Sequence, residues 1–277
     1  MLKNKESLTP IAPHSAASDF ARGDQSNHRF MSEAEEFTDG LAMQRQKRRR
    51  LWIPIGYRSL ALLAKVIGRR NVLRGCLNSS WFLHRIAFEL SGREFGESFH
   101  CDTLGLSPEL LMRWLPPNPR VVDLGCGHGR WCRVMAPYAR HVVGVDTNEE
   151  SIVAARAKTK ARNVEFRVGD ITRSLPGMHF DAALLSHVLE HIDSDHVYAF
   201  LRSIRELSDV LIVEVPDFES DPLNAVRRRL NCPFYSDADH VREYTAALVR
   251  RHLSEAGWDI REMVKRGGGI ALLALQR

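Results

Sequence analysis

The sequence is short of the features that mark secreted, zinc-binding and membrane-spanning proteins. Its 277 residues include five cysteines, an odd number, and no CxxC pair or His/Cys cluster has the spacing of zinc ligands. No apolar run reaches the ~18–20 residues that cross a membrane, and the first twenty residues lack the apolar core of a secretory signal. We therefore expect free thiols, no metal site and a cytoplasmic location.

Basic charge is scarce beyond the first quarter of the chain. Residues 1–75 hold fourteen Lys or Arg against seven Asp or Glu, a net charge of +7, whereas the whole chain carries only +5. The remainder is therefore slightly acidic. A catalytic domain that binds nucleic acid carries a basic face of its own, so we expect no nucleic-acid partner.

Three regions follow from composition and hydrophobic pattern. Residues 1–50 are polar and end in a basic run, which predicts a disordered tail. Residues 51–115 predict accessory helices, among them one near 80–90 with Asn78 or Ser79 as its cap and one that begins after Ser107. A helix over 51–70 would either pack on the domain or lie in the headgroup layer of an anionic membrane, which makes residues 44–75 a candidate membrane contact. Residues 116–277 predict the ligand-binding domain.

From residue 120 onward, strand-like runs alternate with helical stretches. This alternation predicts an α/β fold with a doubly wound, mostly parallel sheet. Two further strands near the C-terminus are too close for a helical crossover, so they must pair as an antiparallel hairpin and bring the sheet to seven strands. The predicted strands cover residues 120–124, 141–145, 164–168, 181–185, 210–215, 260–265 and 270–276.

A glycine-rich turn and two acids follow the first three strands. The turn is Asp123-Leu-Gly-Cys-Gly-His-Gly129, and its glycines permit positive φ and close approach of the backbone to a ligand. Asp146 ends the second strand, where a carboxylate can accept both hydroxyls of a ribose. Asp170 ends the third strand and can accept from an exocyclic amine, while Ile171 can lie on the ring. These positions predict a nucleoside ligand at the carboxyl edge of the sheet.

The same positions, with Ser186-His-Val-Leu-Glu-His191 after the fourth strand, resemble a known family: the Rossmann-like, seven-stranded (class I) S-adenosylmethionine-dependent methyltransferases. The resemblance covers about residues 100–277. It implies that S-adenosyl-L-methionine is the cofactor and that Ser186 and His187 close its site near the sulfonium. It also implies which residues hold each part of the cofactor. The methionine part would be surrounded by Asp123, Gly125, Cys126, Gly127 and Gly129. The ribose would be held by Asp146 with Thr147, and the adenine by Asp170 with Ile171.

Two other functions compete with methyl transfer. A nicotinamide dehydrogenase fingerprint needs glycine or alanine three positions after Gly127, and that place is Arg130. The second rival is a cofactor-binding scaffold without catalysis, held to a membrane or a partner by residues 44–75. We favour the methyltransferase because the turn, the strand-end acids and Arg130 agree with it jointly.

The acceptor side is predicted from the long connection at residues 216–245, which leaves the same sheet edge. A hydroxyl acceptor needs a base, so His187 and His240 are candidate catalytic residues, although a lone histidine is at least as often structural. Residues 236–244 resemble a segment of methyltransferases linked to cell-surface glycan or lipid-carrier chemistry. We expect a small-molecule, glycan or lipid-linked acceptor, with oxygen preferred. The basic run Arg227–Arg229 would either bind a phosphate or carboxylate group or form a solvent-exposed basic face of a helix.

Overall fold

The computed structural model describes residues 52–95, 105–171, 175, 177–234 and 239–277. The predicted tail at residues 1–50 lies outside these ranges. The chain divides into two units, residues 1–68 and 69–277, which are described separately. The predicted region limits at residues 50 and 115 stay predictions.

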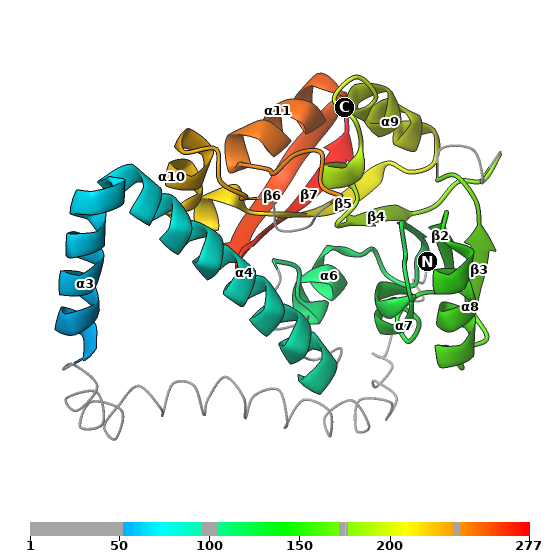
Figure 1. Ribbon diagram of the computed structural model, residues 1–277. Helices are drawn as coiled ribbons and strands as arrows, with labels where there is room; N and C mark the ends of the chain where they lie inside the picture. Colours follow the sequence, from blue (N-terminus) through cyan, green and yellow to red (C-terminus); the bar gives the residue numbers. More distant parts are fainter. Residues whose placement is uncertain (1–51, 96–104, 172–174, 176, 235–238) are drawn as a thin grey trace, which may run out of the picture. The chain divides into compact units, whose positions relative to one another are not determined.

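A seven-stranded sheet forms the centre of the second unit (Figure 1). The strand order is β3-β2-β1-β4-β5-β7-β6, with β1 to β5 parallel and β7 antiparallel to both β5 and β6. The predicted α/β class and the C-terminal hairpin are therefore confirmed. The strands are β1 (Arg120–Leu124), β2 (His141–Asp146), β3 (Val164–Val168), β4 (Ala182–Ser186), β5 (Val210–Pro216), β6 (Trp258–Arg266) and β7 (Gly269–Gln276).

Two apolar cores lie on opposite faces of this sheet because successive side chains of a strand point to opposite sides. Val121 belongs to one core and Val122 to the other. The core around Val121 is covered by α6 (Pro108–Trp114), α7 (Arg130–Met135) and α8 (Glu149–Lys158). The core around Val122 is covered by α9 (Val197–Ser203) and α11 (Ala246–Glu255). Shorter elements of this unit are η1 (Leu189–His191), η2 (Ile204–Glu206), η3 (Phe218–Ser220) and α10 (Asn224–Arg229).

The helices before the sheet confirm one prediction and correct another. Ser107 caps α6 as predicted, with its Oγ accepting from the Leu110 amide at 3.2 Å. The helix predicted near 80–90 is instead the 27-residue α4, Arg69–Phe95, so Asn78 and Ser79 lie inside it and cap nothing. The helical segment is interrupted earlier, at Gly68, between α3 (Trp52–Ile67) and α4. Its φ of 88° is the left-handed conformation that commonly ends helices.

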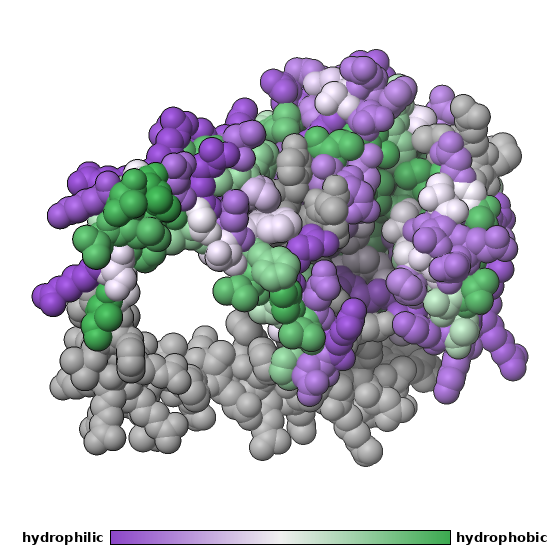
Figure 2. All heavy atoms as spheres, viewed as in Figure 1, coloured by the Kyte–Doolittle hydropathy of each residue, from purple (hydrophilic) through white to green (hydrophobic). Residues whose placement is uncertain are grey.

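The first unit contributes one described helix, α3, over Trp52–Ile67. Its side chains from Ile55 to Ile67 are exposed, apart from the half-buried Ala64. Figure 2 shows apolar side chains gathered over this helix. Among the described residues, no helix is both long enough and apolar enough to span a bilayer.

Candidate functional site

The predicted ligand residues come together at the carboxyl edge of the sheet. Strand pairing sets Leu124 beside Val145 and Asp146 beside Val168, and on the other side of β1 it sets Asp123 beside Leu184. The chain order reverses between β1 and β4, and in doubly wound sheets a crevice for ligands opens at such a reversal. The glycine turn lies directly at this point.

The three glycines of the turn serve two different purposes. All have positive φ, at 78°, 51° and 74° for Gly125, Gly127 and Gly129. A Cβ on Gly125 would come within 2.6 Å of Val188, and one on Gly129 within 2.7 Å of Phe166. A Cβ on Gly127 would meet no protein atom within 4 Å. Gly125 and Gly129 therefore permit close packing inside the protein, whereas Gly127 faces the open space.

Asp146 links the turn to the next helix. Its Oδ2 accepts from the Gly127 amide at 2.8 Å, and its Oδ1 accepts from the Asn148 amide at 2.9 Å. Asn148 in turn caps α8 through the Ser151 amide. Each carboxylate oxygen has a second acceptor position, so Asp146 can hold the turn and still accept from a ligand. Thr147 is exposed beside it.

Asp123 lies under the turn, away from the solvent. It is 1% exposed, and its Oδ2 accepts from Cys132 Sγ at 3.2 Å. Burial raises the pKa of Asp123 to about 7, although the Cys132 hydrogen bond opposes the shift. Cys126 in the turn is also buried. These contacts make Asp123 a support of the turn, and its predicted place around the cofactor stays a prediction.

Asp170 and Ile171 follow β3 on the far side of Asp146. Gly169 donates from its amide to the Asp146 carbonyl at 2.9 Å, which ties the two strand ends together. Asp170 is exposed, and Ile171 packs partly against the apolar core. An exposed acid and a partly buried apolar residue are thus adjacent in the chain at this edge, and their contact with adenine stays a prediction.

Ser186 joins a buried hydrogen-bonded network behind the site. Trp131 Nε1 donates to Ser186 Oγ at 2.9 Å, and Ser186 Oγ donates to Glu214 Oε2 at 2.6 Å. The second oxygen of Glu214 accepts from the Leu106 amide at 2.8 Å. Glu214 is fully buried. Sequence reasoning missed it, because one acid inside an apolar strand carries no motif.

His187 lies between two buried carboxylates. Its backbone has a φ of 56°, its Nδ1 is 3.0 Å from Glu190 Oε1, and its Nε2 is 3.8 Å from Glu214 Oε2. Burial alone would lower the pKa of His187. The hydrogen bond to Glu190 and the charges of Glu214 and Glu190 outweigh that effect and raise the pKa to about 9. The imidazole is therefore protonated at neutral pH and is a hydrogen-bond donor.

His240 is held by a carboxylate of its own. Its Nδ1 lies 2.9 Å from Glu243 Oε1, and both side chains are nearly buried. The ring of His191 packs edge-on against it, with a centroid separation of 4.8 Å. Ligand atoms of Glu190, His191 and His240 lie within 4.8 Å of one another, a grouping that could hold a metal ion. The expected absence of a metal is therefore untested.

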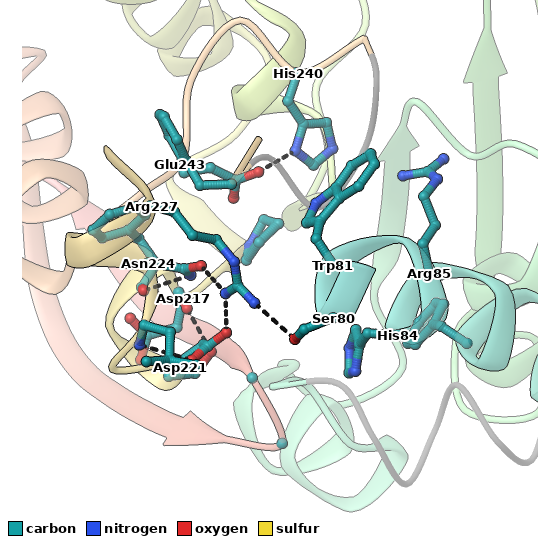
Figure 3. A pocket seen from close by; sticks show the side chains of 18 of the residues that line it. Ser80, Trp81, His84, Arg85, Asp217, Asp221, Asn224, Arg227, His240 and Glu243 are labelled. Atoms are coloured by element: carbon teal, nitrogen blue, oxygen red, sulfur yellow. Dashed lines mark hydrogen bonds and ion pairs between the residues drawn. The ribbon is translucent and has the colours of Figure 1, made fainter. Parts of the chain in front are cut away.

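A cavity of about 500 Å³ brings His187 and His240 to one space. Figure 3 shows Ser80, Trp81, His84 and Arg85 entering it from α4, opposite Asp221, Asn224 and Arg227 of the 216–245 connection. Gly267 and Gly268 of the β6–β7 turn complete the wall. None of the α4 residues was predicted as part of the site, since an accessory helix gives no sequence signal of what its face covers.

Arg228 and Arg229 are exposed, as predicted for a solvated basic face, but this does not hold for Arg227. It is 4% exposed, so it is not part of a solvated face. It forms an ion pair with Asp221 and donates to Asn224 Oδ1 at 3.0 Å and to Ser80 Oγ at 3.3 Å. Its charge is thus engaged by the protein itself and holds the 216–245 connection against α4.

Comparison with known families identifies the domain. The family model described as "Methyltransferase domain" matches residues 102–263. The match spans the glycine turn, the loop after β4 and the connection that carries His240.

Two curated relatives show similarity over part of their length. A ubiquinone biosynthesis O-methyltransferase of Maricaulis maris is 33% identical over 102 residues, which cover 35% of this chain and 39% of that protein. A trans-aconitate 2-methyltransferase of Acidovorax sp. (strain JS42) is 30% identical over 149 residues, which cover 51% of this chain and 56% of that protein. The chain thus spans roughly half or less of their length.

Solved structures share the fold. The pyocyanin biosynthetic protein PhzM superposes with a TM-score of 0.50 at 20% identity, over 61% of this chain and 54% of that one. The PH0226 protein from Pyrococcus horikoshii OT3 also gives 0.50, at 23% identity, over 61% and 87% of the two chains. At these identities the likeness concerns the fold alone.

Proposed function

Because the chain belongs to the methyltransferase domain family, we propose that it transfers a methyl group from S-adenosyl-L-methionine to a hydroxyl oxygen of a small-molecule acceptor. One observation carries the proposal. A single cavity reaches from His187, in the loop after β4, to His240 in the predicted acceptor segment. Such a cavity lets cofactor and acceptor meet.

The residues at the sheet edge fit this cofactor. Gly127 leaves open space where a side chain would otherwise project, and Asp146 stands next to it with accepting capacity for ribose hydroxyls. The exposed Asp170 and the apolar Ile171 suit an adenine amine and ring. When bound, S-adenosyl-L-methionine supplies a methyl group that is already activated by its sulfonium.

The chain's own residues then align the acceptor and move its proton. Alignment contributes much of the rate acceleration when the transferred group is already activated. We assign the proton of the acceptor hydroxyl to His240, which Glu243 orients through Nδ1. The cationic His187 is unsuited as a base and instead holds the loop between Glu190 and Glu214.

Calorimetric titration with S-adenosyl-L-methionine and with its demethylated product tests the cofactor assignment. We expect saturable binding of one molecule per chain. Absence of saturation with both at millimolar concentration would refute the proposal. Saturation without turnover of any acceptor would instead favour the scaffold alternative.

The predictions of a lipid-linked or glycan acceptor and of a peripheral membrane contact are part of the same proposal. A lipid-linked acceptor and peripheral membrane contact are supported by the charge and exposure of α3 and its surroundings. Residues 40–88 contain no acidic residue, and α3 carries Arg58 and Lys65 beside exposed apolar side chains. Anionic lipid attracts such a segment, and its apolar face can enter the interface. A glycan acceptor stays a prediction.

Sedimentation with phosphatidylglycerol vesicles at low salt tests the membrane contact. We expect the wild-type protein in the pellet, and expect Leu62→Asp with Val66→Asp to release it by placing charge among the apolar side chains. The double variant Glu149→Gln with Glu150→Gln, on exposed positions of α8, is the control. Wild-type protein that stays in the supernatant would refute the contact and leave methyl transfer untouched.

A further inference from the structure

The cavity between α4, α10 and the β6–β7 turn is lined by aromatic side chains and by charged side chains that are paired with one another. We propose that its acceptor is an uncharged aromatic compound that carries a ring hydroxyl group. This inference rests on the proposed function, since it names the acceptor of the same cavity. It follows from the aromatic side chains of the wall and from the pairing of its charges.

Four aromatic side chains line the cavity from two directions. Trp81 and Phe88 belong to α4, and Phe218 and Phe234 belong to the 216–245 connection. The rings of Phe218 and Phe234 pack edge-to-face, with centroids 5.6 Å apart. In Figure 3 the Trp81 indole extends from α4 toward His240. Aromatic walls favour a planar ring, because offset stacking and edge contacts add to the gain from apolar burial.

The arginines of the wall are already engaged by neighbouring acids. Arg85 Nε lies 3.6 Å from Glu89 Oε1 on the next turn of α4. Arg227 is paired with Asp221 and held by two further hydrogen bonds. Among the described lining residues, each arginine thus already has a carboxylate partner, and the one Arg227 nitrogen without a hydrogen-bond partner, Nε, is buried. An anionic acceptor would have to break an existing pair to be compensated.

The acids of the wall are engaged as well. Asp217 is buried and lies 2.9 Å from Lys265 Nζ, and Glu243 is bonded to His240. Glu190 and Glu214 lie next to the His187 ring, at 3.0 Å and 3.8 Å from its two nitrogens. The described carboxylates that line the cavity are therefore already paired, and a cationic acceptor would have to break one of these pairs to be compensated. The wall as a whole favours an uncharged ring.

The 500 Å³ volume agrees with a small ring system. Drug-sized ligands occupy pockets of ~300–1,000 Å³ that are mostly apolar and contain a few placed polar groups. Here the placed polar group is His240, at the end of the cavity opposite the α4 residue His84 (Figure 3). A ring hydroxyl directed at His240 would leave the rest of the ring against Trp81.

Three compounds with one ring system test the proposal. The probes are 2-naphthol, 6-hydroxy-2-naphthoate, which adds a negative charge, and 6-(aminomethyl)-2-naphthol, which adds a positive one. Each is titrated calorimetrically into full-length protein saturated with the demethylated cofactor. We expect 2-naphthol to bind at least ~10-fold more tightly than either charged analogue, the factor that ~1.4 kcal/mol gives. A charged analogue that binds as tightly or more tightly would overturn the proposal.

A matched pair of variants on α4 locates the ring. Trp81 lines the cavity, whereas the adjacent Phe82 is 58% exposed and does not line it. We expect Trp81→Ala to weaken 2-naphthol binding about 10-fold, since it removes one aromatic wall, and Phe82→Ala to leave it unchanged. Equal effects of the two variants would contradict the assignment.

The outcomes separate this inference from the proposed function. If the demethylated cofactor binds but none of the naphthols does, or if methyl glucoside binds more tightly than 2-naphthol, the aromatic acceptor is wrong and methyl transfer stands. If the cofactor itself does not bind, the proposed function fails first.

Discussion

The proposed cofactor half and the proposed acceptor half of the site are built from different parts of the chain. The cofactor half consists mainly of backbone and strand ends: the turn at 123–129, Asp146, and the residues after β3 and β4. The acceptor half consists of side chains from α4, from the 216–245 connection and from the β6–β7 turn. The arrangement of the proposed cofactor half follows from the fold. The second half is where the chemistry of this particular chain is determined.

The largest effect is expected in the acceptor half, at His240. Replacing His240 with alanine removes the proposed base and should lower kcat ~10²–10⁴-fold, with the cofactor Kd unchanged because the residue belongs to the 216–245 connection and not to the glycine turn. Glu243→Gln should give a smaller loss, since it only weakens the orientation of the ring. Steady-state kinetics with calorimetric Kd values measures both. A kcat near wild type would make His240 structural.

His187 at the boundary of the two halves should give the next effect, on stability. Its folded pKa of about 9 is higher than the ~6.5 of an unfolded histidine. Its contribution, at most about 3 kcal/mol, is therefore complete below pH ~6.5 and is lost as the pH rises through about 9. Urea unfolding of wild type and His187→Gln at pH 6 and pH 10 measures it. A wild-type advantage that does not shrink with pH would contradict the ion pairing.

Asp146 tests the cofactor half through a side chain. Asp146→Ala removes the proposed ribose acceptor and the Gly127 anchor, so cofactor affinity should fall ~10–100-fold, equivalent to roughly 1.4–2.8 kcal/mol. Asp146→Asn keeps one accepting oxygen and should lose less. Calorimetry on the folded variants gives both values. Unchanged affinity would remove the ribose assignment.

The smallest effect separates binding from packing within the glycine turn. Gly127→Ala places a methyl group in open space and should weaken cofactor binding about 10-fold, or ~1.4 kcal/mol. Gly129→Ala drives a methyl group against Phe166 and should act on stability instead, by ~1–3 kcal/mol. Calorimetry and urea unfolding on both variants make the comparison. Equal binding losses at the two positions would contradict the division of roles.

The placement of the proposed cofactor residues at one sheet edge could be predicted because its signals are local. Strand runs, the spaced glycines and Asp146 each lie within a few residues of the feature that they determine, and parallel pairing then aligns them. The predicted start of the helix near residues 80–90 was wrong. The preceding helix ends at Gly68 and α4 begins at Arg69, so Asn78 and Ser79 lie in the middle of α4. A cap residue is only a signal when the helix actually ends there.

The acceptor half could not be predicted in the same way. Trp81 and Arg227 are 146 positions apart, yet both line the cavity. Nothing near Arg227 in the sequence indicates that Ser80, 147 positions away, will accept a hydrogen bond from it. Glu214 likewise matters only because β4 places Ser186 beside it. Such long-range side-chain contacts come from tertiary packing, which local patterns do not contain.

A crystal structure with the demethylated cofactor bound tests most directly whether the proposed cofactor site opens into the cavity of the acceptor half. The account predicts the adenosine between Asp146 and Asp170, the amino-acid end over Gly127, and the sulfur facing the cavity that His187, His240 and Trp81 line. A sulfur atom that faces solvent, or that protein separates from this cavity, would contradict it.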